Sequence, residues 1–165
     1  MPRGSSADKC RGRFQKRGET MVKHVVVAIG ALAIAATAVI AQGDPIAARQ
    51  AVMKDNSAQA RTVREMAEGK RPFDAAAAKK AFASMADGAN KFSGLFPDNS
   101  KTGGNTKALP VIWEKKADFN AAIAKFGKDA KDAEAKVKDL DTLKAALGEV
   151  GKNCGGCHNA WRAKS

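Results

Sequence analysis

Two cysteines and a histidine lie within five consecutive residues near the end of the chain. The segment Cys154-Gly155-Gly156-Cys157-His158 has the spacing C-x-x-C-H. On a helix, residues three and four apart share a face, so both thiols and the imidazole can reach one bound group. This spacing is typical of covalent haem attachment, in which the thiols bond to the porphyrin vinyl carbons and the histidine binds the iron.

The same three residues allow other interpretations. In an oxidising compartment, Cys154 and Cys157 could form a structural disulfide, which would close a small, strained loop. A thioredoxin-like thiol oxidoreductase needs its cysteine pair in a strand–helix context, and the sequence has no strand pattern. A structural zinc site needs about four ligands, which is more than these residues supply.

An apolar segment precedes most of the chain. Residues 25–41 carry no charge, follow several basic residues and end in small side chains. This pattern predicts a secretory signal peptide over residues 21–41, cleaved after Ala41, and a periplasmic mature protein over residues 42–165. Residues 1–20 are interpreted as a leader extension or a mis-assigned start. A transmembrane anchor is the alternative for the apolar segment.

The mature segment has a moderate positive charge. Residues 42–165 contain 22 Lys and Arg against 15 Asp and Glu, a net charge of +7, compared with +12 for the whole chain. Both signs are interleaved without a basic block, so no nucleic-acid partner is expected. The positive charge favours redox protein partners with acidic docking surfaces. Loss of the leader also removes Cys10 and His24, which leaves two cysteines and one histidine.

An all-α fold is predicted for the mature segment, because it is rich in Ala, Lys, Asp and Glu and contains no Tyr. Apolar residues recur at spacings of three and four, which gives each helix one apolar seam. Short links join the first two and the last two helices, so an antiparallel four-helix bundle is expected. The predicted helices cover residues 45–67, 74–95, 111–137 and 140–162, and a loop covers residues 97–110.

The seam of the last helix runs from Leu140 through Cys154 and Cys157 to Trp161. Both cysteines therefore face the same way as the apolar side chains that pack into the bundle. We expect one covalent haem c against the core, near the C-terminus of the last helix.

The chain resembles the class II c-type cytochromes, the cytochrome c′ family. The residues that carry the resemblance are the C-terminal C-x-x-C-H motif, Arg49-Gln50, Pro110-Val111-Ile112-Trp113 and Phe119. Members of the family are secreted four-helix bundles, and many form homodimers. Arg162 follows His158 by four residues, so we expect it either near the proximal imidazole or as a charge at the C-terminal end of the helix.

The family divides by its sixth iron ligand. Low-spin members, the cytochromes c-556, use a methionine four residues after an arginine, and Met53 follows Arg49 at this spacing. The resemblance therefore implies that His158 and Met53 bind the iron and that Arg49 binds a haem propionate. The alternatives are a core position for Met53, with Met66 and Met85 as other sulfur candidates, and a solvated position for Arg49.

These features predict a periplasmic electron carrier with one low-spin haem. The alternative is a five-coordinate, high-spin cytochrome c′ that binds nitric oxide or carbon monoxide. An enzyme is not expected, because the mature segment has no second histidine and no clustered carboxylates for acid–base catalysis. Trp113, Phe119 and Trp161 are expected to pack in the core or against the haem edge.

Overall fold

The computed structural model describes residues 43–164. The predicted leader extension (1–20) and signal peptide (21–41) lie outside the described residues, as do Cys10 and His24. No helix between residues 43 and 164 combines the length and the apolar character that a membrane span requires.

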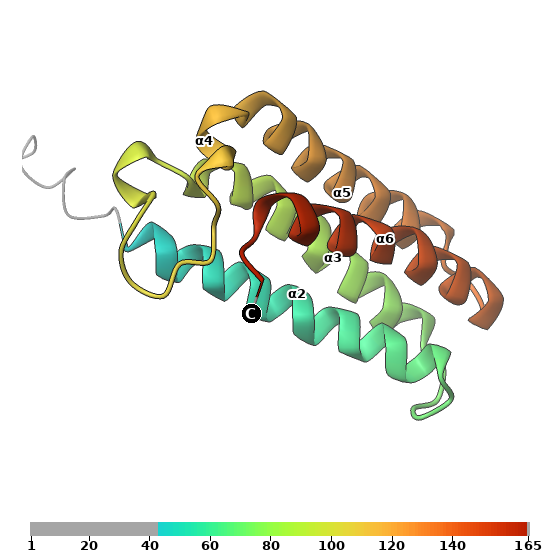
Figure 1. Cartoon of the computed structure of the whole chain (residues 1–165). Coiled ribbons are helices and arrows are strands. Elements are labelled where there is room, and N and C mark those ends of the chain that lie inside the picture. The colour runs from blue at the N-terminus through green and yellow to red at the C-terminus, as the bar shows by residue number, and fades with distance from the viewer. Residues whose placement is uncertain (1–42, 165) are drawn as a thin grey trace, which may run out of the picture. The chain divides into compact units, whose positions relative to one another are not determined.

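The described part of the chain is an antiparallel bundle of four long helices (Figure 1). The helix α2 (Pro45–Ala67) lies beside α3 (Ala75–Phe92), and α3 lies beside α5 (Lys116–Lys136). The last helix, α6 (Leu140–Trp161), lies beside both α5 and α2. Tight turns join α2 to α3 and α5 to α6, whereas a long connection joins α3 to α5 at the other end. The all-α bundle predicted from the sequence is confirmed.

Aspartate side chains cap three of these helices. Asp44, Asp74 and Asp139 each accept hydrogen bonds from backbone N–H groups of the following turn, at 2.8 to 3.0 Å. Thr142 completes a capping box at the start of α6, because its hydroxyl accepts the Asp139 N–H at 3.0 Å. These caps satisfy N–H groups that have no partner within the helix, and they fix where each helix begins.

The predicted helix over residues 111–137 is interrupted in the structure. It divides into α4 (Val111–Glu114) and α5, with Lys115 between them at a non-helical φ of −116° and ψ of 48°. The interruption lets Ile112 become buried and lets the Trp113 indole donate to the Pro97 carbonyl at 3.2 Å. The prediction of one continuous helix here was therefore wrong.

The other helix boundaries differ only slightly from the predicted ones. The helix predicted over residues 74–95 continues beyond Phe92 as a 3₁₀ turn, η2 (Ser93–Leu95), and Phe96 stays buried after it. A second 3₁₀ turn, η3 (Asp98–Ser100), lies inside the loop predicted over residues 97–110.

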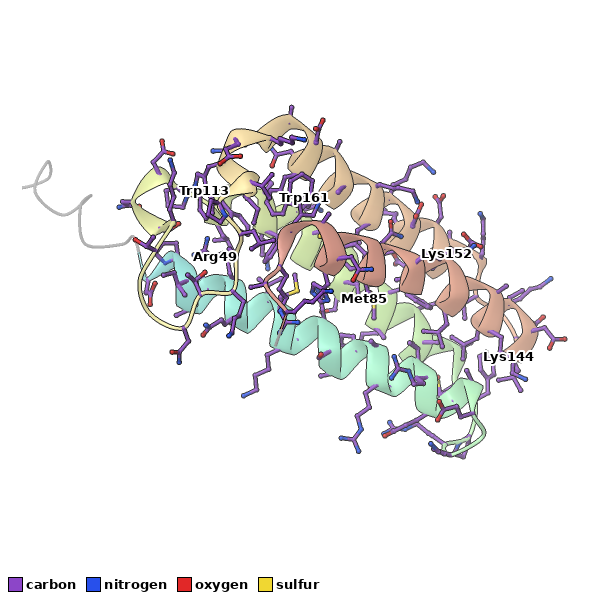
Figure 2. All side chains as sticks on the ribbon, viewed as in Figure 1. Arg49, Met85, Trp113, Lys144, Lys152 and Trp161 are labelled. Atoms are coloured by element: carbon purple, nitrogen blue, oxygen red, sulfur yellow. The ribbon has the colours of Figure 1, made fainter. Side chains whose placement is uncertain are left out.

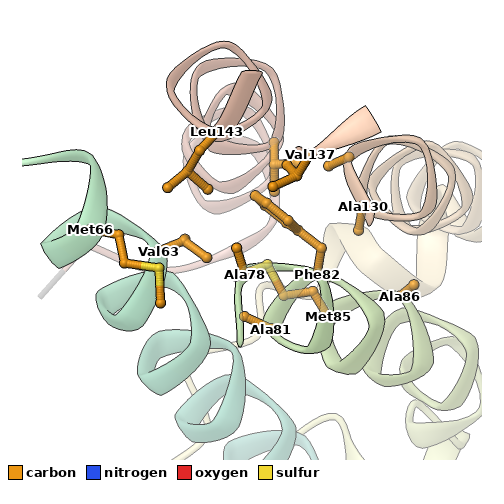
Figure 3. Packing of buried hydrophobic residues seen from close by; sticks show 12 residues of the cluster. Val63, Met66, Ala78, Ala81, Phe82, Met85, Ala86, Ala130, Val137 and Leu143 are labelled. Carbon is orange, nitrogen blue, oxygen red and sulfur yellow. The ribbon is translucent and has the colours of Figure 1, made fainter. Parts of the chain in front are cut away.

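The end of the bundle with the tight turns has a closely packed apolar core (Figure 3). Its largest fully buried side chains are Phe82, Met66 and Leu143, which come from α3, α2 and α6. Where α3 crosses α5, a Cβ on Gly127 would lie 3.1 Å from the Ala89 Cβ. Small residues at this crossing therefore let the two helices approach each other closely.

Truncation of Leu143 is expected to destabilise the holoprotein by about 2–5 kcal/mol, because its side chain has no exposed surface and Leu143→Ala leaves a cavity. Urea denaturation followed by circular dichroism measures the change. Lys144→Ala, at the exposed neighbouring position of α6, is the matched control and should change the free energy of unfolding by less than about 0.5 kcal/mol. Equal effects of the two substitutions would contradict the packing described here.

Candidate haem site

The C-x-x-C-H motif lies in the last two turns of α6, which continues as regular helix to Trp161. The seam of α6 becomes more exposed toward this end: Leu143 and Val150 are buried, Cys157 is half-buried and Cys154 is exposed. The seam loses its cover because the bundle opens in front of the motif. Both cysteines therefore remain accessible on the side of α6 that faces the other helices.

Both cysteine residues are free thiols in the structure. Burial raises the pKa of Cys154 and that of Cys157, whereas the reactive cysteines of thiol oxidoreductases have lowered pKa values. Partial burial, with a smaller contribution from the Arg162 guanidinium, lowers the pKa of His158. The neutral imidazole favoured in this way is the form that can bind a metal ion.

Two adjoining cavities, of about 320 and 480 Å³, lie in front of the motif. Cys157 and His158 line both cavities, and Cys154 lines the larger one. The volumes lie in the range of protein sites for small molecules and cofactors. Apolar side chains form most of the remaining wall, including Ile46, Phe92, Ile112, Phe119, Ile123, Phe126, Leu147 and Val150.

Met53 lies on α2 and lines both cavities, together with Cys157 and His158. Of the other two sulfur candidates, Met85 lines only the larger cavity, and Met66 lines neither. Met66 packs instead in the core at the end of the bundle with the tight turns (Figure 3). Met53 is therefore the thioether that shares both cavities with the histidine.

Arg49 is buried at one end of the smaller cavity, with only 5% of its surface exposed. One guanidinium nitrogen donates to the Ser100 carbonyl at 3.0 Å, and the guanidinium carbon lies 4.6 Å from the centre of the Phe96 ring. The other terminal nitrogen, Nη1, is buried without a hydrogen-bond partner. Burial lowers the pKa of Arg49, partly offset by the Asp44 carboxylate.

Aromatic rings line the smaller cavity next to Arg49, and Figure 2 shows Arg49, Trp113 and Trp161 at this end of the bundle. Trp161 packs on Phe119 with ring centres 5.5 Å apart, Phe119 on Phe96 at 4.7 Å, and Phe96 on Trp113 at 5.8 Å. This agrees with the prediction that Trp113, Phe119 and Trp161 pack in the core. The contact between Phe96 and Arg49 had no signal in the sequence spacing.

The end of the chain closes this side of the cavity. The Leu109 N–H donates to the Trp161 carbonyl at 3.0 Å, and the Ala163 N–H donates to the Lys107 carbonyl at 2.8 Å. The tail leaving α6 is thereby fixed to the connection between η3 and α4, and Lys107 and Arg162 line the cavity. Sequence reasoning did not identify Lys107, because its place depends on this backbone pairing.

The described residues fit a covalently bound haem. Two thiols and an imidazole open onto cavities with apolar and aromatic walls, as a porphyrin requires. The unpartnered Nη1 of Arg49 is a buried donor that lacks an acceptor, and a propionate would supply one. Within residues 43–164, no group of three or more His, Cys, Asp and Glu side chains is arranged to hold a metal ion directly.

Comparison with known proteins agrees with this geometry. Residues 44–162 match the family model described as Cytochrome C'. The chain belongs to the cytochrome c′ family. It is therefore a c-type cytochrome with one covalently attached haem c, as the motif predicted.

Two similar proteins come from Rhodopseudomonas palustris. Its cytochrome c′ is 39% identical over 144 residues, which cover 87% of this chain and 99% of the relative. Its cytochrome c-556 is also 39% identical, over 148 residues and the same shares of each chain. A solved structure of cytochrome c′ from this bacterium has 43% identity and a TM-score of 0.73, and it covers 75% of this chain and 99% of its own. The equal identities do not separate the two branches of the family.

Proposed function

We propose that this member of the cytochrome c′ family is a periplasmic electron carrier. Cys154 and Cys157 would attach the haem, and His158 and Met53 would bind its iron. The bound haem supplies one-electron exchange between ferric and ferrous iron. The observation that carries the proposal is that Met53, on α2, lines the same two cavities as Cys157 and His158, on α6.

Met53 bears on the choice between an electron carrier and a gas binder. A thioether is a soft, neutral ligand that favours the ferrous state, and a methionine at this position leaves no open coordination site for a gas. Two protein ligands on the iron would keep its coordination similar in the two oxidation states. These properties suit repeated electron transfer better than gas binding.

Arg49 is proposed to bind a haem propionate. Its Nη1 is buried without a partner, while Nη2 and the contact with Phe96 hold the guanidinium in place. A propionate beside it would form a charge-assisted hydrogen bond. Arg49 would thus orient the porphyrin at the end of the cavity remote from the tight turns.

An absorption spectrum of the purified periplasmic protein tests the choice of function. We expect low-spin spectra for the ferric and the ferrous protein, and no change when carbon monoxide is added to the ferrous form. The physical reason is that a bound Met53 sulfur blocks the site that carbon monoxide needs. A high-spin ferric spectrum with saturable carbon monoxide binding would instead support the five-coordinate gas-binding cytochrome c′.

A further inference from the structure

The cavity walls carry positive charge without any negative charge. Among the described residues that line the two cavities, four have cationic side chains and none is an aspartate or a glutamate. The remaining polar lining residues are neutral amides and hydroxyls, apart from His158. The four cationic residues are Arg49, Arg64, Lys107 and Arg162.

Three of these cations lie at the outer edge of the cavities. Arg64, Lys107 and Arg162 are exposed and are called the basic rim here, whereas Arg49 is buried. Arg162 lines both cavities, so the rim extends from α2 across the end of α6 to the connection before α4. The basic rim therefore lies on the exposed border of the two cavities that the haem would occupy.

Two acidic side chains on α5 and α6 are held by other groups, and the Asp44 carboxylate interacts with the buried Arg49. Asp129 on α5 accepts from Asn153 of the larger cavity at 2.8 Å and forms an ion pair with Lys125. Glu149 on α6 forms an ion pair with Lys152 at 2.7 Å. Neither Arg64 nor Lys107 forms an ion pair within the part of the chain that the structure describes. Their charges therefore act on whatever approaches the cavities.

Haem binding would not cancel this positive charge. The two propionates of one haem carry two negative charges at neutral pH, and the cavity residues supply four positive ones. Propionates beside Arg49 and one further cation would leave an excess of positive charge at the rim. Charged clefts of this kind raise association rates with oppositely charged partners by about 10- to 1,000-fold.

We propose that the basic rim is the docking surface for an acidic redox protein, which exchanges one electron with the haem across this border. The inference rests on the proposed carrier function and adds the residues that receive the partner. In the direction tested below, the partner is oxidised by one electron and the haem iron is reduced from ferric to ferrous. Arg64 and Lys107 act by electrostatic steering and not by contact with the iron.

The test measures reduction of the ferric holoprotein by stopped-flow absorbance. The probe is a plant-type [2Fe–2S] ferredoxin, an acidic one-electron reductant. We expect its second-order rate constant to fall at least tenfold between about 0.01 and 0.2 M ionic strength, because the Debye length shortens from about 30 Å to less than 10 Å. The double substitution Arg64→Glu/Lys107→Glu should lower the rate constant at low salt at least tenfold.

Two controls isolate docking from damage to the haem site. Lys144→Glu changes the charge of an exposed lysine near the opposite end of α6 (Figure 2) and should leave the ferredoxin rate within about twofold of wild type. Neutral lumiflavin semiquinone, an uncharged one-electron reductant, measures the reduction of each variant without charge steering, so the ratio of the ferredoxin rate to the lumiflavin rate isolates docking. The milder pair Arg64→Gln/Lys107→Gln should give an intermediate ferredoxin rate.

Equal ferredoxin rates in the rim variants and in Lys144→Glu would overturn the docking surface. Binding to anionic phosphatidylglycerol vesicles that depends on Arg64 and Lys107, with unchanged ferredoxin rates, would overturn it in favour of a membrane surface. Carbon monoxide binding by the same sample would contradict the carrier proposal. Carbon monoxide binding does not change the ratio of ferredoxin to lumiflavin rates. Failure of the carrier proposal can therefore be distinguished from failure of the docking surface.

Discussion

A protein with serine at both Cys154 and Cys157 is expected to lose covalently bound haem completely. Each thioether bond forms by addition of a thiol S–H across a porphyrin vinyl group, and a serine hydroxyl does not replace the thiol. The measurement is a haem stain of the periplasmic fraction after denaturing electrophoresis, normalised to an immunoblot. The stained signal of Cys154→Ser/Cys157→Ser should fall to background.

Single substitutions make this prediction sharper. Cys154→Ser and Cys157→Ser should each retain one possible thioether bond and give a reduced but detectable stain. Ala160→Ser places the same side chain at an exposed position of α6 outside both cavities, and it should keep the wild-type signal. Full staining of the double variant would contradict attachment through this motif, and it would require another site for the haem.

The helices of this protein could be predicted because local signals determine them. The aspartates at positions 44, 74 and 139 mark helix starts through hydrogen bonds within the next turn, so they can be identified without knowing the fold. Along α3, residues spaced three and four apart are buried, namely Ala78, Phe82, Met85, Ala89 and Phe92. Periodicity identifies a buried face because burial follows the helical repeat.

The details at the haem end of the bundle depend on contacts between distant residues. Lys115 interrupts a helix between Glu114 and Lys116, without Gly or Pro at this point, and the packing of Ile112 and Trp113 accounts for the interruption. Arg49 is buried because Phe96 and the Ser100 carbonyl come from another part of the chain. The spacing of residues along the sequence does not reveal such contacts. The position of Lys107 in the cavity wall and the backbone pairing of the tail after α6 were therefore not predicted.

The methionine ligand was predicted partly from a local signal and partly from the family resemblance. The spacing from Arg49 to Met53 is a local signal, but its meaning came from the family resemblance and not from physical chemistry. In the structure Met53 lines both cavities, whereas Met85 lines one and Met66 neither. Spacing alone could not rank these three sulfurs, because each is compatible with a core position on an amphipathic helix.

Met53→Ala is expected to convert the haem iron from low spin to high spin. Removal of the thioether leaves His158 as the only protein ligand, so the ferric spectrum should become that of a five-coordinate or water-ligated haem. The ferrous form should gain saturable carbon monoxide binding where the wild type has none. The reduction potential should fall, because the lost sulfur favours ferrous iron. Absorption spectra, carbon monoxide titration and a redox titration measure the three effects.

The other methionines supply matched controls for this substitution. Met66→Ala removes a fully buried side chain from the core, so it should lower the free energy of unfolding by about 2–5 kcal/mol without changing the spin state. Met85→Ala removes a side chain that lines the larger cavity, so this cavity becomes wider. The variant should keep the low-spin spectrum if Met53 is the ligand. A low-spin Met53→Ala protein, or a spin change in Met85→Ala alone, would contradict the assignment. A spin change confined to Met53→Ala separates ligation from packing, since all three substitutions remove the same side chain.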